Sequence, residues 1–226
     1  MATLVLTHEA GLNHATPEGH PEQVARLEHV LHALRAADVT VETAPLATRE
    51  DLLLCHPESY IARLEDTLPD SGQVPLDSDT WMSPGSLEAA CRAVGAMREA
   101  VDRVLDGDAG NAFCATRPPG HHAEMETPMG FCLFGTVAIG AKHALERHGL
   151  SRVAVVDFDV HHGNGTQALL WDENRAFFAT SQQMPLWPGS GEPSERGAHD
   201  NILNVPLAPG TDGYEMRDAY THDIFP

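Results

Sequence analysis

The stretch from residue 153 to residue 165 constrains the fold more than any other part of this sequence. Four apolar residues, 153–156, run directly into Asp157, Asp159 and His161. Because side chains alternate between the two faces of a β-strand, these three polar side chains are predicted to project to the same side. A carboxylate and an imidazole two residues apart can bind one cation, and a mixed Asp/His ligand set is typical of catalytic zinc. The sequence therefore predicts a buried strand that ends in metal ligands.

Short apolar segments alternate with amphipathic helical patterns along the whole chain. Strands are expected near residues 2–7, 39–44, 112–115, 152–158, 176–180 and 201–207. Helices are expected from Pro21, from a capping box of Thr48 and Asp51, from Pro57, and over 87–104, 137–145, 165–171 and 214–220. The Pro- and Gly-rich stretch 67–85 is expected to be a long surface loop. This alternation predicts an α/β domain with a mainly parallel sheet, and 226 residues suffice for one core.

A second histidine-rich segment also follows a predicted strand. Residues 112–115 lead into Arg117-Pro-Pro-Gly, a stiff turn before His121 and His122. Ligand sites in parallel sheets lie beyond the carboxyl ends of the strands, so this pair is expected to meet the 157–161 segment in one crevice. Two imidazoles beside a metal-bound water can divide the roles of general base and general acid. One His-His pair is weak evidence in a chain with 14 histidines, but two at strand ends indicate a catalytic site.

The composition excludes several classes of partner. The formal net charge is −19, and Lys142 is the only lysine. Such acidity disfavours binding to phosphate backbones, so no nucleic-acid partner is expected. It favours cationic substrates, although acidity is more often an adaptation for solubility. No signal peptide and no apolar run long enough for a bilayer is present, and the four cysteines form no C-x-x-C pair. We therefore expect a cytoplasmic protein without a membrane partner.

Five motifs in this order resemble those of the histone deacetylase/acetylpolyamine amidohydrolase family. They are R-P-P-G-H-H-A (117–123), G-F-C (130–132), D-F-D-V-H-H-G-N-G-T-Q (157–167), W-P-G-S-G (187–191) and N-V-P-L (204–207). Asn164, where class I eukaryotic members carry aspartate, makes the chain look closer to the class II and bacterial branch. The resemblance implies a three-layer α/β/α fold of the arginase/deacetylase type. It also implies a zinc-dependent deacetylase that removes acetyl or other acyl groups from an amine.

The resemblance further implies a role for each matching residue. Asp159 and His161 match two of three zinc ligands, and His121 and His122 match the catalytic pair. Asp157 matches the carboxylate behind His121, and Asn164 the partner of His122, which is therefore expected to be the better base. Three further matches are to residues that line an acyl-lysine tunnel: Gly130, Phe131 and Trp187. The last set matches residues that hold a structural K⁺ or Na⁺: Asp157, Asp159, His161, Ser181 and Gln182.

The sequence departs from the family at its end. The resemblance implies a third aspartate ligand, a tyrosine that stabilises the oxyanion, and further strands and helices, all after Pro226. We therefore expect residues 1–226 to form a single, incomplete deacetylase domain that lacks these C-terminal elements and the third zinc ligand. A truncated form of an ordinary deacetylase is the favoured explanation. A degenerate member that acts as a binding module is the alternative, and arginase-like chemistry with two metals ranks lower.

Several properties stay open at this point. The expected substrate is a small acylated amine, such as an acetylpolyamine, or an acetyl-lysine peptide, and a homo-oligomer is compatible with the sequence. His8, His14 and His20 lie in a polar loop and are expected to be solvated. Asp159 and His161 are expected to be buried, because a buried carboxylate without a partner would be too costly to keep for packing alone.

Overall fold

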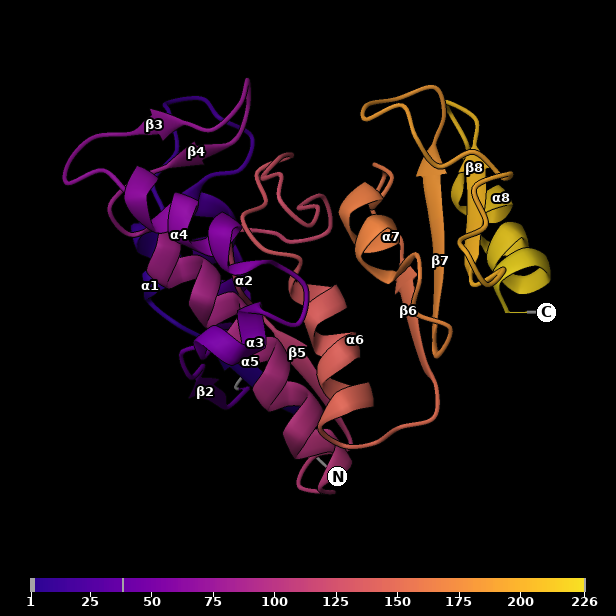
Figure 1. Ribbon diagram of the computed structural model, residues 1–226, viewed down its shortest axis with the longest axis horizontal. Coiled ribbons are helices and arrows are strands. Elements are labelled where there is room, and N and C mark those ends of the chain that lie inside the picture. The colour runs from indigo at the N-terminus through magenta and orange to yellow at the C-terminus, as the bar shows by residue number, and fades with distance from the viewer. Residues whose placement is uncertain (1–2, 38, 226) are drawn as a thin grey trace.

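Two groups of parallel strands form the centre of the fold in the computed structural model, which describes residues 3–37 and 39–225 (Figure 1). The first group has the order β2–β1–β5, with β1 (Thr3–Thr7), β2 (Val41–Thr43) and β5 (Asn111–Cys114). The second group has the order β6–β7–β8, with β6 (Val153–Asp157), β7 (Ala176–Gln183) and β8 (Ile202–Leu207). Every pairing in these two groups is parallel. The predicted α/β class with a mainly parallel sheet is confirmed.

Helices connect the strands and pack beside them. They are α1 (Ala10–Asn13), α2 (Val24–Ala36), α3 (Arg49–Leu52), α4 (Glu58–Thr67), α5 (Ser86–Leu105), α6 (Thr136–Glu146), α7 (Asn164–Leu170), α8 (Gly213–Ala219) and a π-helical turn (Tyr220–Ile224). In Figure 1, α1 to α5 lie with the first strand group, α7 and α8 lie with the second, and α6 stands between them. Among the described residues, no helix combines the length and the apolar character that crossing a bilayer requires.

Three local predictions can be compared with the structure. The capping box of Thr48 and Asp51 is confirmed at the start of α3. The prediction that Pro21 begins a helix is wrong, because α2 starts at Val24 and Glu22 is instead buried in an ion pair with a distant arginine. The stretch 67–85 is not entirely loop, since β3 (Val74–Pro75) and β4 (Trp81–Met82) form a short antiparallel hairpin within it.

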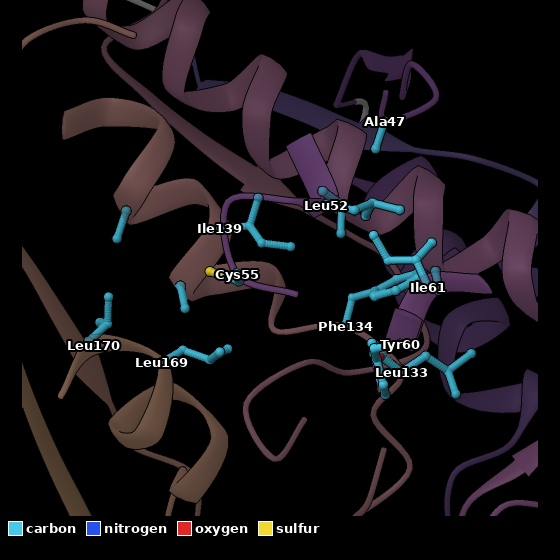
Figure 2. Close-up of a cluster of buried hydrophobic side chains, with 14 of the residues drawn as sticks. Ala47, Leu52, Cys55, Tyr60, Ile61, Leu133, Phe134, Ile139, Leu169 and Leu170 are labelled. Carbon is cyan, nitrogen blue, oxygen red and sulfur yellow. The ribbon is translucent and has the colours of Figure 1, made fainter. Parts of the chain in front are cut away.

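One hydrophobic cluster joins the two strand groups. It contains Tyr60 of α4 and Ile139 of α6 together with Leu170 of α7 and Phe178 of β7, all at most 1% exposed. Figure 2 shows Leu169 and Leu170 in the same cluster as Ile139 and Tyr60. Burying side chains of this size contributes roughly 1.5–3 kcal/mol each. The core therefore fixes the position of β6 and α7 relative to α6, and with it the geometry of the segments that follow β5 and β6.

Candidate active site

His121 and His122 lie where the two strand groups meet. His121 follows β5, and its Nδ1 is 2.8 Å from Asp157 Oδ2 at the end of β6. The centroids of the two adjacent imidazole rings are 3.9 Å apart. The carboxyl ends of β5 and β6 therefore meet in one crevice, as the sequence predicted, although 36 residues separate His121 from Asp157.

Asn164 holds the second histidine of this pair. His122 is buried, and its Nδ1 lies 2.8 Å from Asn164 Oδ1. The amide nitrogen of Asn164 donates to Glu124 Oε1 at 2.8 Å, so the amide oxygen is the group that faces the ring. An amide oxygen only accepts, and His122 Nδ1 must therefore carry the proton. This arrangement leaves Nε2 of a neutral His122 as a free acceptor. Glu124 is a functional neighbour that the sequence did not indicate.

The two histidines have opposite electrostatic surroundings. Burial lowers the pKa of His121, but the hydrogen bond to Asp157 and its charge outweigh burial, so the pKa lies above its ordinary value. Burial and the neighbouring charge of His121 lower the pKa of His122 to about 4. Burial raises the pKa of Asp157, but the hydrogen bond with His121, the charge of His121 and the bond from the Asp159 N–H together outweigh burial, so the net pKa is lowered. The surroundings therefore favour the protonated form of His121 and the neutral form of His122.

Asp159 and His161 lie beside the pair, but they are not buried. Their side chains are 48% and 39% exposed, with His161 Nδ1 3.1 Å from Asp159 Oδ1. The ring of His161 is 6.0 Å from that of His122. The prediction that both are buried is wrong, because the strand stops at Asp157 and the segment after it runs along the surface. Among the described residues, no third His, Cys, Asp or Glu joins Asp159 and His161 in a metal-sized group.

Gly130 and Trp187 lie against His122. A Cβ on Gly130 would come within 2.3 Å of His122 Cδ2 and 2.7 Å of Trp187 Cη2, and its φ of +54° also favours glycine. Trp187 stands 4.7 Å from the His122 ring, centroid to centroid, and is 42% exposed. Phe131 adopts a φ of +70°, and its backbone N–H donates to Thr80 Oγ1 at 3.0 Å. These residues form one rim of the crevice, and the carbonyl of Gly130 already accepts a weak bond from Cys132 Sγ.

Ser181 and Gln182 lie on β7, next to the end of β6. Ser181 Oγ is 2.9 Å from the hydroxyl of Tyr220, which also donates to the backbone carbonyl of Asp157 at 3.4 Å. Gln182 donates through Nε2 to the carbonyl of Gly191, and its Oε1 is buried without a partner in the described residues. Tyr220 therefore joins Asp157 to Ser181, and Asp159 lines the same hollow as Ser181 and Gln182. The place of Tyr220 in the last helical turn gave no signal in the sequence.

A buried ion pair lies behind the histidine pair. Arg117 donates from Nε and Nη2 to the two carboxylate oxygens of Glu22, each at 2.7 Å, and from Nη1 to the carbonyl of His14. His14 is 1% exposed, with Nδ1 2.6 Å from Ser86 Oγ, so the prediction that it is solvated is wrong. His20 is only partly exposed and bonds the carbonyl of Asp79. This loop is fixed by distant partners, which local polarity does not reveal.

The crevice opens into a cleft beside β6. The cleft has a volume of about 500 Å³ and is lined by Gly120, His121, Val155, Asp157 and Asp159, among others. A second hollow, of about 230 Å³, lies on the other side of the 158–160 segment and reaches Ser181 and Gln182. The arrangement combines a hydrogen-bonded histidine pair, an exposed carboxylate and imidazole, and a concave surface, which are features that suit hydrolysis assisted by a metal.

The chain is similar in sequence to a known protein family. Residues 20–226 match the histone deacetylase domain. The chain is 37% identical over 227 residues to a protein named probable deacetylase from Archaeoglobus fulgidus, covering 96% of this chain and 62% of that protein. It is 40% identical over 195 residues to a histone deacetylase-like amidohydrolase from Pseudomonas aeruginosa, covering 84% and 51%.

A solved structure shares the fold. The crystal structure of the HDA15 HD domain superposes with a TM-score of 0.93 at 29% identity, and covers 99% of this chain and 67% of that one. The chain thus spans about half to two thirds of the length of these relatives. The similarity includes every segment that carries a predicted site residue, since these segments lie between residues 117 and 191.

Proposed function

Because the chain belongs to the histone deacetylase family, we propose that it carries most of the catalytic centre of a zinc-dependent amidohydrolase that removes acyl groups from acylated amines. The observation that carries this proposal is the His121–His122 pair. Each ring has its own partner, and burial and charge move the two pKa values in opposite directions. Pairs of titratable groups whose environments separate their pKa values are typical of acid–base catalysis.

Asp159 and His161 would supply protein ligands to the metal. A carboxylate oxygen and an imidazole nitrogen suit zinc chemically, and their exposure leaves both free to bind it. The described residues provide two of the three ligands that a catalytic zinc site normally has, so metal binding by this chain alone is expected to be weak. When bound, zinc would polarise the acyl carbonyl and lower the pKa of a water molecule.

The two histidines would divide the proton transfers. His122 holds its proton on Nδ1 through Asn164, so its Nε2 can take a proton from the attacking water. Asp157 favours the protonated form of His121, which can give a proton from Nε2 to the departing amine. Because the pKa of His122 is lowered to about 4, the base is unprotonated at neutral pH. The reaction would yield a carboxylate and a free amine.

The remaining predicted residues would bind the substrate or stiffen the site. Phe131 and Trp187 are proposed to line a tunnel for an acyl-lysine or acylpolyamine chain, with the Gly130 carbonyl at its base. This is supported by the contact of Gly130 with both His122 and Trp187. Ser181, Gln182 and the segment Asp157 to His161 are proposed to hold K⁺ or Na⁺. The unpartnered Oε1 of Gln182 supports a cation nearby.

Turnover of acetylated amines by the zinc-loaded chain tests the proposal. We expect amine release from an acetyl-lysine peptide or an acetylpolyamine, and a loss of about 10²–10⁴-fold in His122→Ala without loss of zinc. His199→Ala, which changes an exposed histidine outside the crevice, should leave turnover unchanged. Equal activity of His122→Ala would refute the assigned role. Peptide binding without any turnover would favour the binding-module alternative.

A further inference from the structure

A second cluster of metal-ligand side chains lies far from the crevice. Asp102 on α5, His143 on α6 and His148 in the loop before β6 bring three ligand atoms within 4.8 Å of one another. His143 Nε2 is 2.5 Å from Asp102 Oδ1, and His148 Nε2 is 2.7 Å from the same oxygen. The C-terminal ends of α5 and α6 lie near the bottom of Figure 1. His148 precedes β6, whereas His121 contacts Asp157 at the carboxyl end of that strand. Nothing in the proposed deacetylase chemistry uses these residues.

The chemistry of these three groups suits a transition metal better than a simple hydrogen-bonded cluster. Two imidazole nitrogens from different elements converge on one carboxylate oxygen, Oδ1 of Asp102. The second oxygen is occupied by Arg98, whose Nη1 donates to Asp102 Oδ2 at 3.2 Å and orients the carboxylate. Two imidazoles and one carboxylate form a ligand set that zinc and similar divalent ions prefer over calcium or magnesium.

The dimensions also fit an ion after a small rearrangement. Ligand atoms of a tetrahedral zinc site, each about 2.0–2.1 Å from the metal, lie about 3.3 Å from one another. The Nε2–Oδ1 separations here are 2.5 and 2.7 Å, so the side chains need to open by less than about 1 Å. Asp102 and His148, with side chains 24% and 22% exposed, can move in this way, while His143 is buried and fixed.

The surroundings favour a positive ion at this position. Asp102 and His143 each lie within the last turn of a helix, where the free carbonyl groups give the helix its negative end. The protein as a whole is strongly acidic, with a net charge of −19. Arg98 opposes binding, but it contacts the oxygen of Asp102 that faces away from the two imidazoles.

We propose that Asp102, His143 and His148 bind a divalent transition-metal ion, with zinc as the prime candidate, in a structural site that is separate from the catalytic centre. The ion would tie α5 to α6 and both helices to the loop that leads into β6. The partial exposure of Asp102 and His148 leaves a further coordination position for water. An ion that binds only the folded state stabilises it, and the rise in melting temperature grows with the logarithm of the ratio of ion concentration to Kd.

Calorimetric titration with Zn²⁺ tests the site. The metal-free full chain carrying Asp159→Asn and His161→Asn is used, so that the proposed catalytic ligands do not contribute. We expect one equivalent of Zn²⁺ to bind, and a rise of about 5 °C or more in melting temperature at a hundredfold excess over Kd. Adding His148→Gln should weaken binding at least about tenfold and remove the rise, and His143→Gln should do the same. His199→Gln, at an exposed histidine, is the matched control and should change neither.

Two results would overturn the proposal. One is no Zn²⁺ binding in the Asp159→Asn/His161→Asn background. The other is binding that His148→Gln leaves unchanged. His148 is partly exposed and outside any helix, so its variant is expected to fold even if His143→Gln does not. Failure of this site would leave the deacetylase proposal intact, because turnover is measured with the native Asp159 and His161.

Discussion

Residues 117–123 and residues 157–161 each lie at the carboxyl end of a parallel strand and each carry histidines proposed for the site, yet the protein encloses only the first segment. None of the residues in the 117–123 segment is exposed, and Arg117, His121 and His122 all have side-chain partners from distant parts of the chain. In the 157–161 segment, residues 158–160 are all exposed. The residues proposed for proton transfer are therefore held by partners from distant parts of the described fold, whereas the proposed metal ligands bond mainly within their own segment.

The physical cause of the difference is the kind of partner that each segment has. Arg117 forms a bidentate pair with Glu22, which is 95 residues away in the sequence. The bonds made by Asp159 and His161 are local, because the backbone N–H of each donates to the aspartate two residues before it. Local bonds of this type fix a turn. After Asp157, the segment is attached to β7 by a backbone bond from the N–H of Gln183 to the carbonyl of Val160 at 2.9 Å. Rigidity of the first segment should therefore depend on a few buried polar contacts.

Removing the arginine of the buried pair is expected to give the largest effect. Arg117→Met leaves the Glu22 carboxylate buried without its main partner, and we expect a loss of about 3–5 kcal/mol in the free energy of unfolding, measured with urea. Burial raises the pKa of Glu22, but hydrogen bonds from His14 and Arg117 dominate and lower it to about 2. Arg196→Met breaks an exposed pair with Asp200 and serves as the control, with only a small change expected. Similar losses in the free energy of unfolding for both variants would show that the buried pair does not hold the 117–123 segment more firmly than an exposed pair would.

The second largest effect is expected from protonation of the buried His56 when the pH is lowered. His56 is 1% exposed; its Nε2 accepts the backbone N–H of Gly135, and its Nδ1 donates to the carbonyl of Met125. Protonation would put a second donor against Gly135, and burial lowers the pKa of His56 from 6.5 to about 4. The unfolded chain therefore binds a proton that the folded chain excludes between these values. The contribution to stability is complete above pH 6.5 and falls by up to roughly 3 kcal/mol as the pH decreases to 4.

The control for this effect is a variant without the titrating group. Urea unfolding of the wild type and of His56→Gln at several pH values between 7 and 4 isolates the contribution of His56, because other groups titrate in both proteins. We expect the wild type to lose more stability than the variant over this interval. Parallel curves for the two proteins would show that His56 is not held neutral by its surroundings.

The sequence predicted the class of the fold and the residues of the crevice, but not the geometry of the ligand segment. Alternation of side chains along a strand was extended past Asp157, yet Asp157 Oδ1 accepts the N–H of Asp159, and Asp159 Oδ1 accepts the N–H of His161. These side-chain bonds compete with strand pairing and end β6 at Asp157. The residue types correctly suggested polar chemistry at the end of the strand. The backbone path depended on whether side-chain bonds or strand pairing would win, and the hydrophobic pattern does not decide between them.

Contacts between distant segments were the other part that the sequence did not reveal. His14 lies in a polar loop and is nevertheless buried, because Ser86 and Glu22 enclose it. Asp102 and His143 are 41 residues apart, and only the packing of α5 against α6 brings them together. A motif of consecutive residues, such as 117–123, can be recognised in the sequence. A cluster that forms only when two helices pack together leaves no recognisable spacing in the sequence.

The smallest effect is expected from the apolar side chains of the open segment. Phe158 and Val160 are 74% and 51% exposed and form a ridge between the two hollows. Replacing both with serine should change the free energy of unfolding by no more than about 0.5 kcal/mol for each site, since little apolar surface is lost from the core. Phe178→Ala on β7, fully buried at 0% exposure, is the matched control and should cost about 3–5 kcal/mol.

Urea unfolding at two protein concentrations tests whether the 157–161 segment is exposed in solution, in contrast to the enclosed 117–123 segment. If Phe158 and Val160 are exposed in solution, the stability of the wild type is independent of concentration and equals that of the double variant. A loss comparable to that of Phe178→Ala, or one that grows with protein concentration, would mean that another copy of the chain covers the ridge. The 157–161 segment would then be enclosed as well, by association rather than by its own fold, and the metal ligands Asp159 and His161 would be ordered by the same contact.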